Sequence, residues 1–163
     1  MVNNLSATKK GLITAIAMIL VALAFVLNGM PFSGSHQYAV YGIYSAGITW
    51  TLILFAKSNP GNRSFKSFFG EGFRCFVVAT LLMVVYTYII LKTHTSYRDI
   101  AAAEYQKQLQ LSGNKTPDEV VTAVAQMKSK FAIYITGGAV FVYLIIGALV
   151  TAIGSAFLTR NKS

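Results

Sequence analysis

Histidine, cysteine and carboxylate side chains are the groups that could bind a metal or act as nucleophiles, and this chain has few of them. The sequence holds two histidines, His36 and His94, and Asp99 could join them as a third zinc ligand. Their spacing matches no zinc motif, in which ligands recur at short fixed intervals. We therefore predict two solvated loop histidines and no metal site.

The single cysteine, Cys75, has two interpretations. It lies near the start of an apolar run and close to basic residues, which is where S-palmitoylation occurs. We adopt the other interpretation, a buried and inert thiol, because a free cysteine usually packs as a small apolar side chain. One cysteine also excludes an internal disulfide framework and a cysteine-based metal cluster.

The sequence contains no catalytic motif. Serine, histidine and aspartate occur, but no spacing assembles them into a nucleophile and its base. Gly70 and Gly72 flank Glu71 without the strand that precedes a phosphate-binding loop, so we expect these glycines to relieve crowding at a bend. We predict no catalytic residue, no cofactor and no enzymatic activity. A lipid-modifying enzyme is the least supported class, because no acid–base pair is present.

The composition indicates a membrane protein. Of 163 residues, 55% are hydrophobic and only 12% are charged, and the mean hydropathy is +0.56. A soluble domain has about a quarter charged residues. The net charge of +9 comes from basic residues that flank the apolar runs. Such residues meet anionic lipid headgroups, so we predict the lipid bilayer as a partner and no nucleic acid.

Four apolar runs are long enough to cross a membrane as helices. We predict an all-α integral membrane protein in which residues 1–163 form one membrane domain. A cleaved signal peptide is the alternative for the first run, but its length and the three runs that follow favour an uncleaved helix. No ionisable residue lies in the middle of a run, which argues against a proton-coupled transporter. The predicted spans are 11–27, 38–56, 73–91 and 131–158.

The polar segment 92–130 predicts a helical hairpin outside the membrane, in which the third and fourth spanning helices are extended. We expect the rising arm to break at 93–95, since β-branched residues beside a polar one are mediocre helix formers. Gly113 is expected to end this arm in a left-handed conformation. Thr116 and Glu119 form a capping box that starts the last helix. Apolar residues then form a seam that leads into the last span: Val120, Val124, Met127 and Phe131.

The distribution of cations predicts the orientation. Four spans place both termini on one side, and that side holds eight cations in short segments, while the long loop opposite holds six. Because cytoplasmic segments near helix ends are enriched in Lys and Arg, we predict both termini inside and the hairpin outside the cytoplasm. The eight cations are Lys9, Lys10, Lys57, Arg63, Lys66, Arg74, Arg160 and Lys162.

The stretch 64–74 is aromatic, basic and amphipathic. Its phenylalanines fall on one helical face at i, i+3, i+4 and i+8. This pattern predicts an anchor that lies in the membrane interface just before the chain turns to cross. A docking surface for anionic lipid or for a partner is the alternative. The predicted anchor residues are Phe65, Lys66, Phe68, Phe69, Phe73 and Arg74.

Small residues at four-residue spacing predict where helices approach closely. Gly42 and Ala46 form such a pair in the second span, and we expect ordinary packing within the chain there rather than a dedicated dimer face. In the last span, Gly147, Thr151 and Ser155 recur every four residues and are expected to face a neighbouring helix.

Taken together, these features resemble a family of small bacterial membrane proteins, domain-of-unknown-function family 4199. The shared features are a short basic N-terminus, a first pair of helices, a polar insert and two short segments. The first segment is 65–73, Phe-Lys-Ser-Phe-Phe-Gly-Glu-Gly-Phe, and the second is 146–153, Ile-Gly-Ala-Leu-Val-Thr-Ala-Ile, in the last helix. The resemblance implies a multi-pass protein of the bacterial inner membrane, and it implies no activity.

Two functions are compatible with these observations. The first is a non-enzymatic membrane protein that scaffolds or modulates a partner complex, with a membrane-protein partner or a homo-oligomer as its assembly. The alternative is a small oligomeric channel or permease. Its polar path would be lined by Ser45, Thr49, Thr80, Thr87 and Thr136.

Overall fold

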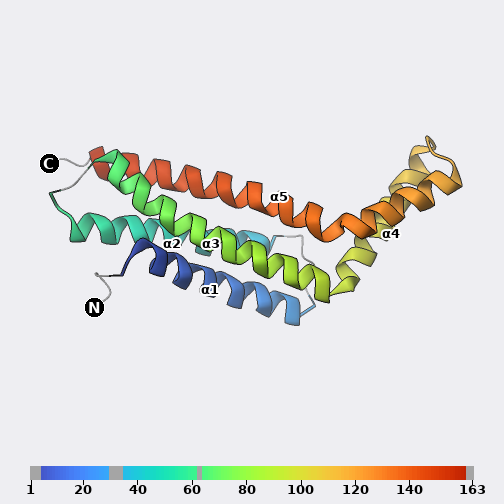
Figure 1. The fold of residues 1–163 in the computed structure, drawn as a ribbon, viewed down its shortest axis with the longest axis horizontal. Coiled ribbons are helices and arrows are strands. Elements are labelled where there is room, and N and C mark those ends of the chain that lie inside the picture. Colours follow the sequence, from blue (N-terminus) through green and yellow to red (C-terminus); the bar gives the residue numbers. More distant parts are fainter. Residues whose placement is uncertain (1–4, 30–34, 62–63, 161–163) are drawn as a thin grey trace. The chain divides into compact units, whose positions relative to one another are not determined.

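The fold is entirely helical in the part of the chain that the computed structural model describes, residues 5–29, 35–61 and 64–160. Four of the five helices, α1, α2, α3 and α5, are long and apolar enough to cross a membrane, and each contains one of the predicted spans. The predicted all-α fold with four apolar helices is confirmed. The helices are α1 (Ala7–Leu27), α2 (Gln37–Ser58), α3 (Phe65–Thr93), α4 (Thr95–Ser112) and α5 (Pro117–Arg160) (Figure 1).

The helix ends follow local chemistry. His94 leaves the helical conformation (φ −101°, ψ 81°) and separates α3 from α4, as predicted. Gly113 ends α4 in the left-handed region (φ 64°), where a residue without Cβ meets no steric penalty. The Thr116 N–H donates to Glu119 Oε2 at 2.8 Å, and the Glu119 N–H donates to Thr116 Oγ1 at 3.3 Å. The predicted capping box is therefore present at the start of α5.

No turn separates the aromatic stretch from the third span. We expected an interfacial segment over 64–74 followed by a bend, but α3 is one helix from Phe65 onward. The glycines at 70 and 72 do not break it, because single glycines in a helix cost only about 1 kcal/mol each relative to alanine. The aromatic stretch is thus the first part of a spanning-length helix.

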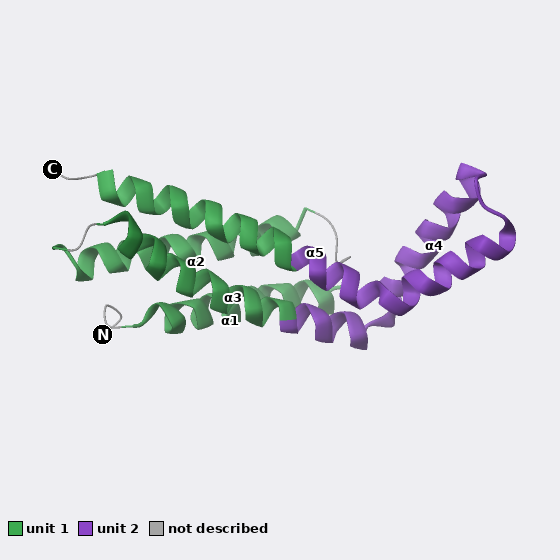
Figure 2. Ribbon diagram, turned by 45° about the horizontal axis from the view of Figure 1, so that its top comes forward, with its two compact units in different colours: residues 1–84, 140–163 green, residues 85–139 purple. Residues whose placement is uncertain are grey.

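The chain divides into two compact units (Figure 2). Unit 1 comprises residues 1–84 and 140–163, which include α1, α2, the first part of α3 and the last part of α5. Unit 2 comprises residues 85–139, which include the end of α3, α4 and the first part of α5.

Unit 1 is a helix bundle that is apolar on the outside as well as inside. Its largest fully buried side chains include Tyr44, Phe68, Met18, Ile48 and Leu52. Its outward-facing apolar side chains include Leu20, Leu81, Phe141 and Phe157, which are 60–70% exposed. A helix that is hydrophobic all round suits a membrane-spanning position.

Small residues bring the backbones of unit 1 together. A Cβ placed on Gly11 of α1 would lie 2.5 Å from the Cys75 carbonyl oxygen of α3. A Cβ on Gly72 of α3 would lie 2.6 Å from the Thr151 methyl carbon of α5. Real Cβ atoms do not approach other atoms this closely, so only glycine permits these two helix contacts.

The predicted packing positions divide into two groups. Gly147, Thr151 and Ser155 are all buried against neighbouring helices of unit 1. Gly42 and Ala46 are exposed, and a Cβ on Gly42 would meet nothing within 4 Å. Among the described residues no helix packs on Gly42, so the packing that we expected there within the chain is not found in this part of it.

Unit 2 has a small apolar core and two ion pairs that share Asp99. Ala102 of α4 and Val120 of α5 are buried. Lys128 Nζ of α5 lies 3.2 Å from Asp99 Oδ1 of α4, and Arg98 Nε lies 3.4 Å from the same oxygen. Both cations lower the pKa of the Asp99 carboxyl from its usual value, and Lys128 has the larger effect. The Lys128–Asp99 ion pair connects α4 to α5, although exposed ion pairs are individually weak.

We predict that Gly147→Ala destabilises unit 1 by about 2 kcal/mol, as overpacking does in tightly packed cores. The new methyl would lie 2.5 Å from the Tyr44 hydroxyl and 2.8 Å from the Phe76 ring. Both side chains are at most 2% exposed, so neither can move aside easily. The free energy of unfolding in mixed detergent micelles measures the effect.

Gly42→Ala is the matched control, because it adds the same methyl to open space in another helix of the bundle. We expect it to be neutral or slightly stabilising, since alanine is the better helix former. Equal losses from both substitutions would contradict the packing described for Gly147.

Candidate functional site

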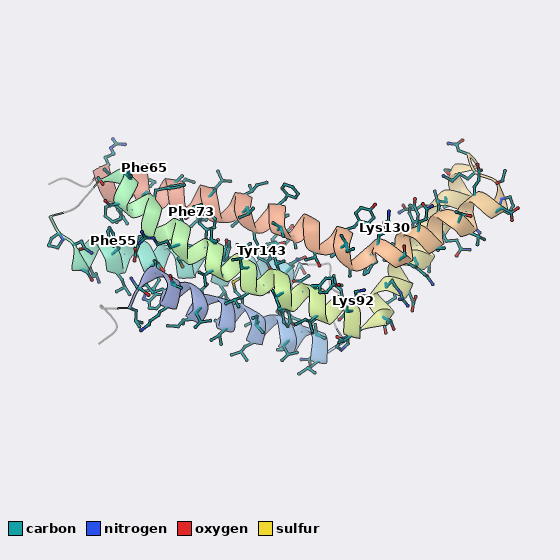
Figure 3. The ribbon with its side chains drawn as sticks, in the orientation of Figure 1. Phe55, Phe65, Phe73, Lys92, Lys130 and Tyr143 are labelled. Atoms are coloured by element: carbon teal, nitrogen blue, oxygen red, sulfur yellow. The ribbon has the colours of Figure 1, made fainter. Side chains whose placement is uncertain are left out.

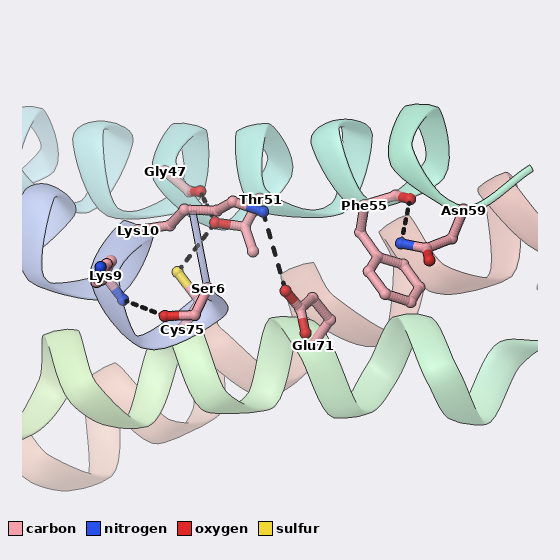
Figure 4. A network of polar contacts seen from close by, with 9 residues as sticks. All are labelled: Ser6, Lys9, Lys10, Gly47, Thr51, Phe55, Asn59, Glu71 and Cys75. Carbon is pink, nitrogen blue, oxygen red and sulfur yellow. Dashed lines mark hydrogen bonds and ion pairs between the residues drawn. The ribbon is translucent and has the colours of Figure 1, made fainter. Parts of the chain in front are cut away.

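A buried ion pair joins α1 to α3 in unit 1. Lys10 Nζ lies 3.9 Å from Glu71 Oε1, and the two side chains are only 3% and 14% exposed (Figure 4). A charge removed from water is costly unless a partner of opposite sign compensates it. The pair therefore explains how two ionisable side chains can lie inside an apolar bundle.

The helical periodicity of α1 turns Lys10 inward and Lys9 outward. Ala7, Thr14 and Met18 are buried on the face of α1 that also carries Lys10. Lys9 lies 100° away around the helix and is exposed. We expected both lysines to be flanking charges, and only the four-residue repeat of small residues in α1 indicates which side of this helix faces inward.

Further polar side chains lie in the same part of the bundle, and Figure 4 shows two of them, Thr51 and Cys75, beside the ion pair. The Thr14 hydroxyl donates to the Lys10 carbonyl at 2.9 Å. The Thr51 hydroxyl of α2 lies 3.2 Å from Cys75 Sγ of α3 and 2.9 Å from the Gly47 carbonyl. Cys75 is fully buried, which agrees with an inert thiol. We call Lys10, Thr14, Thr51, Glu71 and Cys75 the polar layer.

The polar layer has the chemistry of a structural contact. Its hydroxyls bond to backbone carbonyls and to sulfur, and its carboxylate faces an ammonium group. No histidine of the described residues is bonded to Cys75 as a base. Within the same residues, no group of three His, Cys, Asp or Glu side chains could hold a metal ion.

A second polar contact joins three helices through Tyr44 of α2. Its oxygen lies 2.8 Å from Thr80 Oγ1 of α3, and its O–H reaches the Tyr143 carbonyl of α5 at 3.1 Å. The Tyr143 ring packs edge-on against the Tyr44 ring at 5.5 Å. Because Gly147 has no side chain, the Tyr44 hydroxyl fits beside its backbone. Tyr44 thus binds α2, α3 and α5 together at one point.

The predicted anchor residues do not all share one environment. The Phe65, Phe69 and Phe73 rings stack in a row along α3, with centroids 5.8 and 6.3 Å apart, and the first and last of them are about half exposed (Figure 3). Phe68 is fully buried and packs edge-on against Phe55 of α2 at 5.3 Å. It belongs to the bundle core.

The two cations of the predicted anchor, Lys66 and Arg74, are both exposed on α3. Glu71, which lies between them in sequence, is turned toward Lys10. The aromatic row and the two cations therefore form the outer surface of α3, whereas Glu71 and Phe68 form part of the interior.

The two histidines have separate local surroundings. The ring of His36, in unit 1, lies 5.2 Å from the Phe25 ring. His94, in unit 2, is exposed, and its Nδ1 lies 3.0 Å from Thr93 Oγ1. The Asp99 carboxylate forms ion pairs with Lys128 and Arg98.

We predict that Lys10→Met destabilises the protein by about 3 kcal/mol, because it leaves the Glu71 carboxylate buried without a partner. Lys9→Met is the matched control on the adjacent, exposed position, and we expect a change below about 0.5 kcal/mol. Unfolding in mixed micelles distinguishes the two variants.

The double variant Lys10→Met/Glu71→Gln removes both charges at similar volume. We expect it to be more stable than Lys10→Met alone, since a buried ion pair can be replaced by neutral groups at little cost. If Lys10→Met and Lys9→Met behave alike, or if the double variant regains nothing, Lys10 and Glu71 are not a buried pair.

The comparisons with known proteins give one result. The family model for protein of unknown function (DUF4199) matches residues 9–160. The comparison with curated proteins found no match, and neither did the comparison with solved structures. Because the family match covers nearly the whole chain, the resemblance inferred from the sequence is confirmed, and the chain belongs to the DUF4199 family.

Proposed function

We propose that this protein is a non-enzymatic, multi-pass protein of the bacterial inner membrane that scaffolds or modulates another membrane protein. Both termini lie in the cytoplasm, and α4 with the first part of α5 forms a hairpin outside the cytoplasm. This hairpin is the surface that contacts the partner. The DUF4199 family description assigns no activity, so it is compatible with this proposal but is not evidence for it.

The length of α5 supports a hairpin beyond the bilayer. Its 44 residues rise about 66 Å at 1.5 Å per residue. The hydrocarbon core of a bilayer is only about 30 Å thick. The first part of α5 carries Asp118, Glu119, Lys128 and Lys130, so it is the part that belongs in water.

The cation distribution supports the orientation. Lys57, Lys66 and Arg160 are exposed at helix ends of unit 1, and Arg74 is exposed within the first three turns of α3, as expected for cytoplasmic flanks. Lys10 contributes less than the sequence implied, because Glu71 neutralises it. Two other cations of the predicted inner side, Arg63 and Lys162, lie outside the described residues.

The observation that carries the proposal is a pair of exposed, large apolar side chains on a mainly polar helix. Ile100 and Leu111 of α4 are 69% and 78% exposed. They are eleven residues apart, which places them on the same face of the helix, with the exposed Glu104 and Lys107 between them. Large apolar side chains that are exposed on a mainly polar helix are the ones that contact with a partner would remove from water.

The alternative, a small oligomeric channel or permease, has weaker support. Thr80 is buried and bonded to Tyr44, and Thr87 is buried too, whereas Thr49 is exposed. The predicted pore-lining hydroxyls therefore do not share one surface. A homo-oligomer would instead use the open, exposed face at Gly42 and Ala46 of α2.

The test compares two α4 variants of the full-length protein after purification from the membrane in mild detergent. Ile100→Asn/Leu111→Asn removes both exposed apolar side chains, and we expect the co-purifying membrane protein to be lost. Gln106→Asn/Gln110→Asn is the control, because it changes two exposed polar residues of the same helix.

A partner retained by both variants would contradict the role proposed for α4. Purified protein that carries solutes across liposome membranes would favour the channel instead. The two outcomes are measured separately, so each hypothesis can fail alone.

A further inference from the structure

The outer face of α3 carries two cations on one side of the helix. Lys66, Gly70 and Arg74 follow each other at i, i+4 and i+8, so they lie in a row along the helix. Lys66 and Arg74 are exposed, and further along a neighbouring line of the same face Leu81 is 61% exposed. The two cations thus come directly before the apolar part of α3, which is long enough to cross a membrane.

The space between the two cations is open. A Cβ on Gly70 would meet nothing within 4 Å, whereas a Cβ on Gly72, two residues on, would meet Thr151 at 2.6 Å. Each cation is four residues from Gly70, or about 6 Å along the helix axis. Both long side chains can therefore converge on a group that rests against the bare backbone at Gly70.

No carboxylate of the described residues forms an ion pair with either cation. Glu71 is the acidic residue nearest in sequence to these two cations, and it faces Lys10 on the inner side of α3. Lys66 and Arg74 are thus available to an anionic ligand from outside the chain.

The stacked rings of Phe65, Phe69 and Phe73 run beside the cation row, displaced from it by one residue. Figure 3 shows Phe65 and Phe73 along this first part of α3. Aromatic side chains favour the boundary between headgroups and acyl chains. A ligand for this surface needs an anionic group beside an apolar body.

We propose that Lys66, Gly70 and Arg74 bind the phosphate headgroup of one anionic phospholipid, with its acyl chains along Phe73 and Leu81, which lie beyond Gly70 toward the apolar part of α3. This site is more specific than an interfacial anchor, which needs the cations but not the open space at Gly70. The site does not depend on the scaffold role or on which leaflet holds this end of α3.

The test measures binding of phosphatidylglycerol to the full-length protein in detergent by native mass spectrometry, with phosphatidylcholine as the neutral lipid. A cation near a lipid surface contributes about fivefold in affinity, so Lys66→Gln/Arg74→Gln is expected to weaken phosphatidylglycerol binding about 30-fold. Lys9→Gln/Lys57→Gln is the matched control, with the same change in charge on exposed residues of α1 and α2. We expect it to change the affinity little.

Gly70→Leu fills the space without changing the charge. We expect it to weaken phosphatidylglycerol binding and leave the phosphatidylcholine signal unchanged, and excess inorganic phosphate is expected not to displace the lipid. Helical circular dichroism confirms that each variant is folded. Equal losses from the two charge variants, or an unaffected Gly70→Leu, would overturn the proposal and leave only diffuse electrostatic attraction.

Discussion

Close contact between helix backbones is the constraint on which unit 1 depends. In lipid, helices gain little by burying apolar surface against each other, so packing and polar contacts must hold them together. At the crossing of α1 and α3, Gly11 touches the Cys75 backbone, and one residue away Lys10 meets Glu71. The close backbone contact and the ion pair thus lie at the same crossing of α1 and α3. Because this interior is filled with structural contacts, we place the functional surfaces outside it, on α4 and on the start of α3.

Features with a local cause were predictable from the sequence. The four apolar helices follow from composition and run length, and the break at His94 follows from mediocre helix formers. Gly113 and the Thr116–Glu119 capping box are set by residues within one turn of each other. The inward direction of Gly147 could also be predicted, because a repeat of small residues along a helix indicates its packing side.

Features that depend on the neighbouring helix were not predictable. Phe68 was expected at the interface with the other phenylalanines, yet it is buried because Phe55 of α2 covers that side of α3. Lys10 and Glu71 are 61 positions apart in a chain of 163, and only the crossing of α1 with α3 brings them together. In helices that are apolar all round, periodicity does not reveal which face meets protein and which meets lipid.

The proposed topology has four spans and places α4 outside the cytoplasm, and labelling of single cysteines in intact cells tests it most directly. In a Cys75→Ala background, Gln108→Cys places a thiol on the exposed surface of α4, and Asn59→Cys places one after α2. We predict that a membrane-impermeant maleimide labels position 108 in intact cells and position 59 only after permeabilisation. The reverse pattern, or labelling of both positions in intact cells, would contradict this topology.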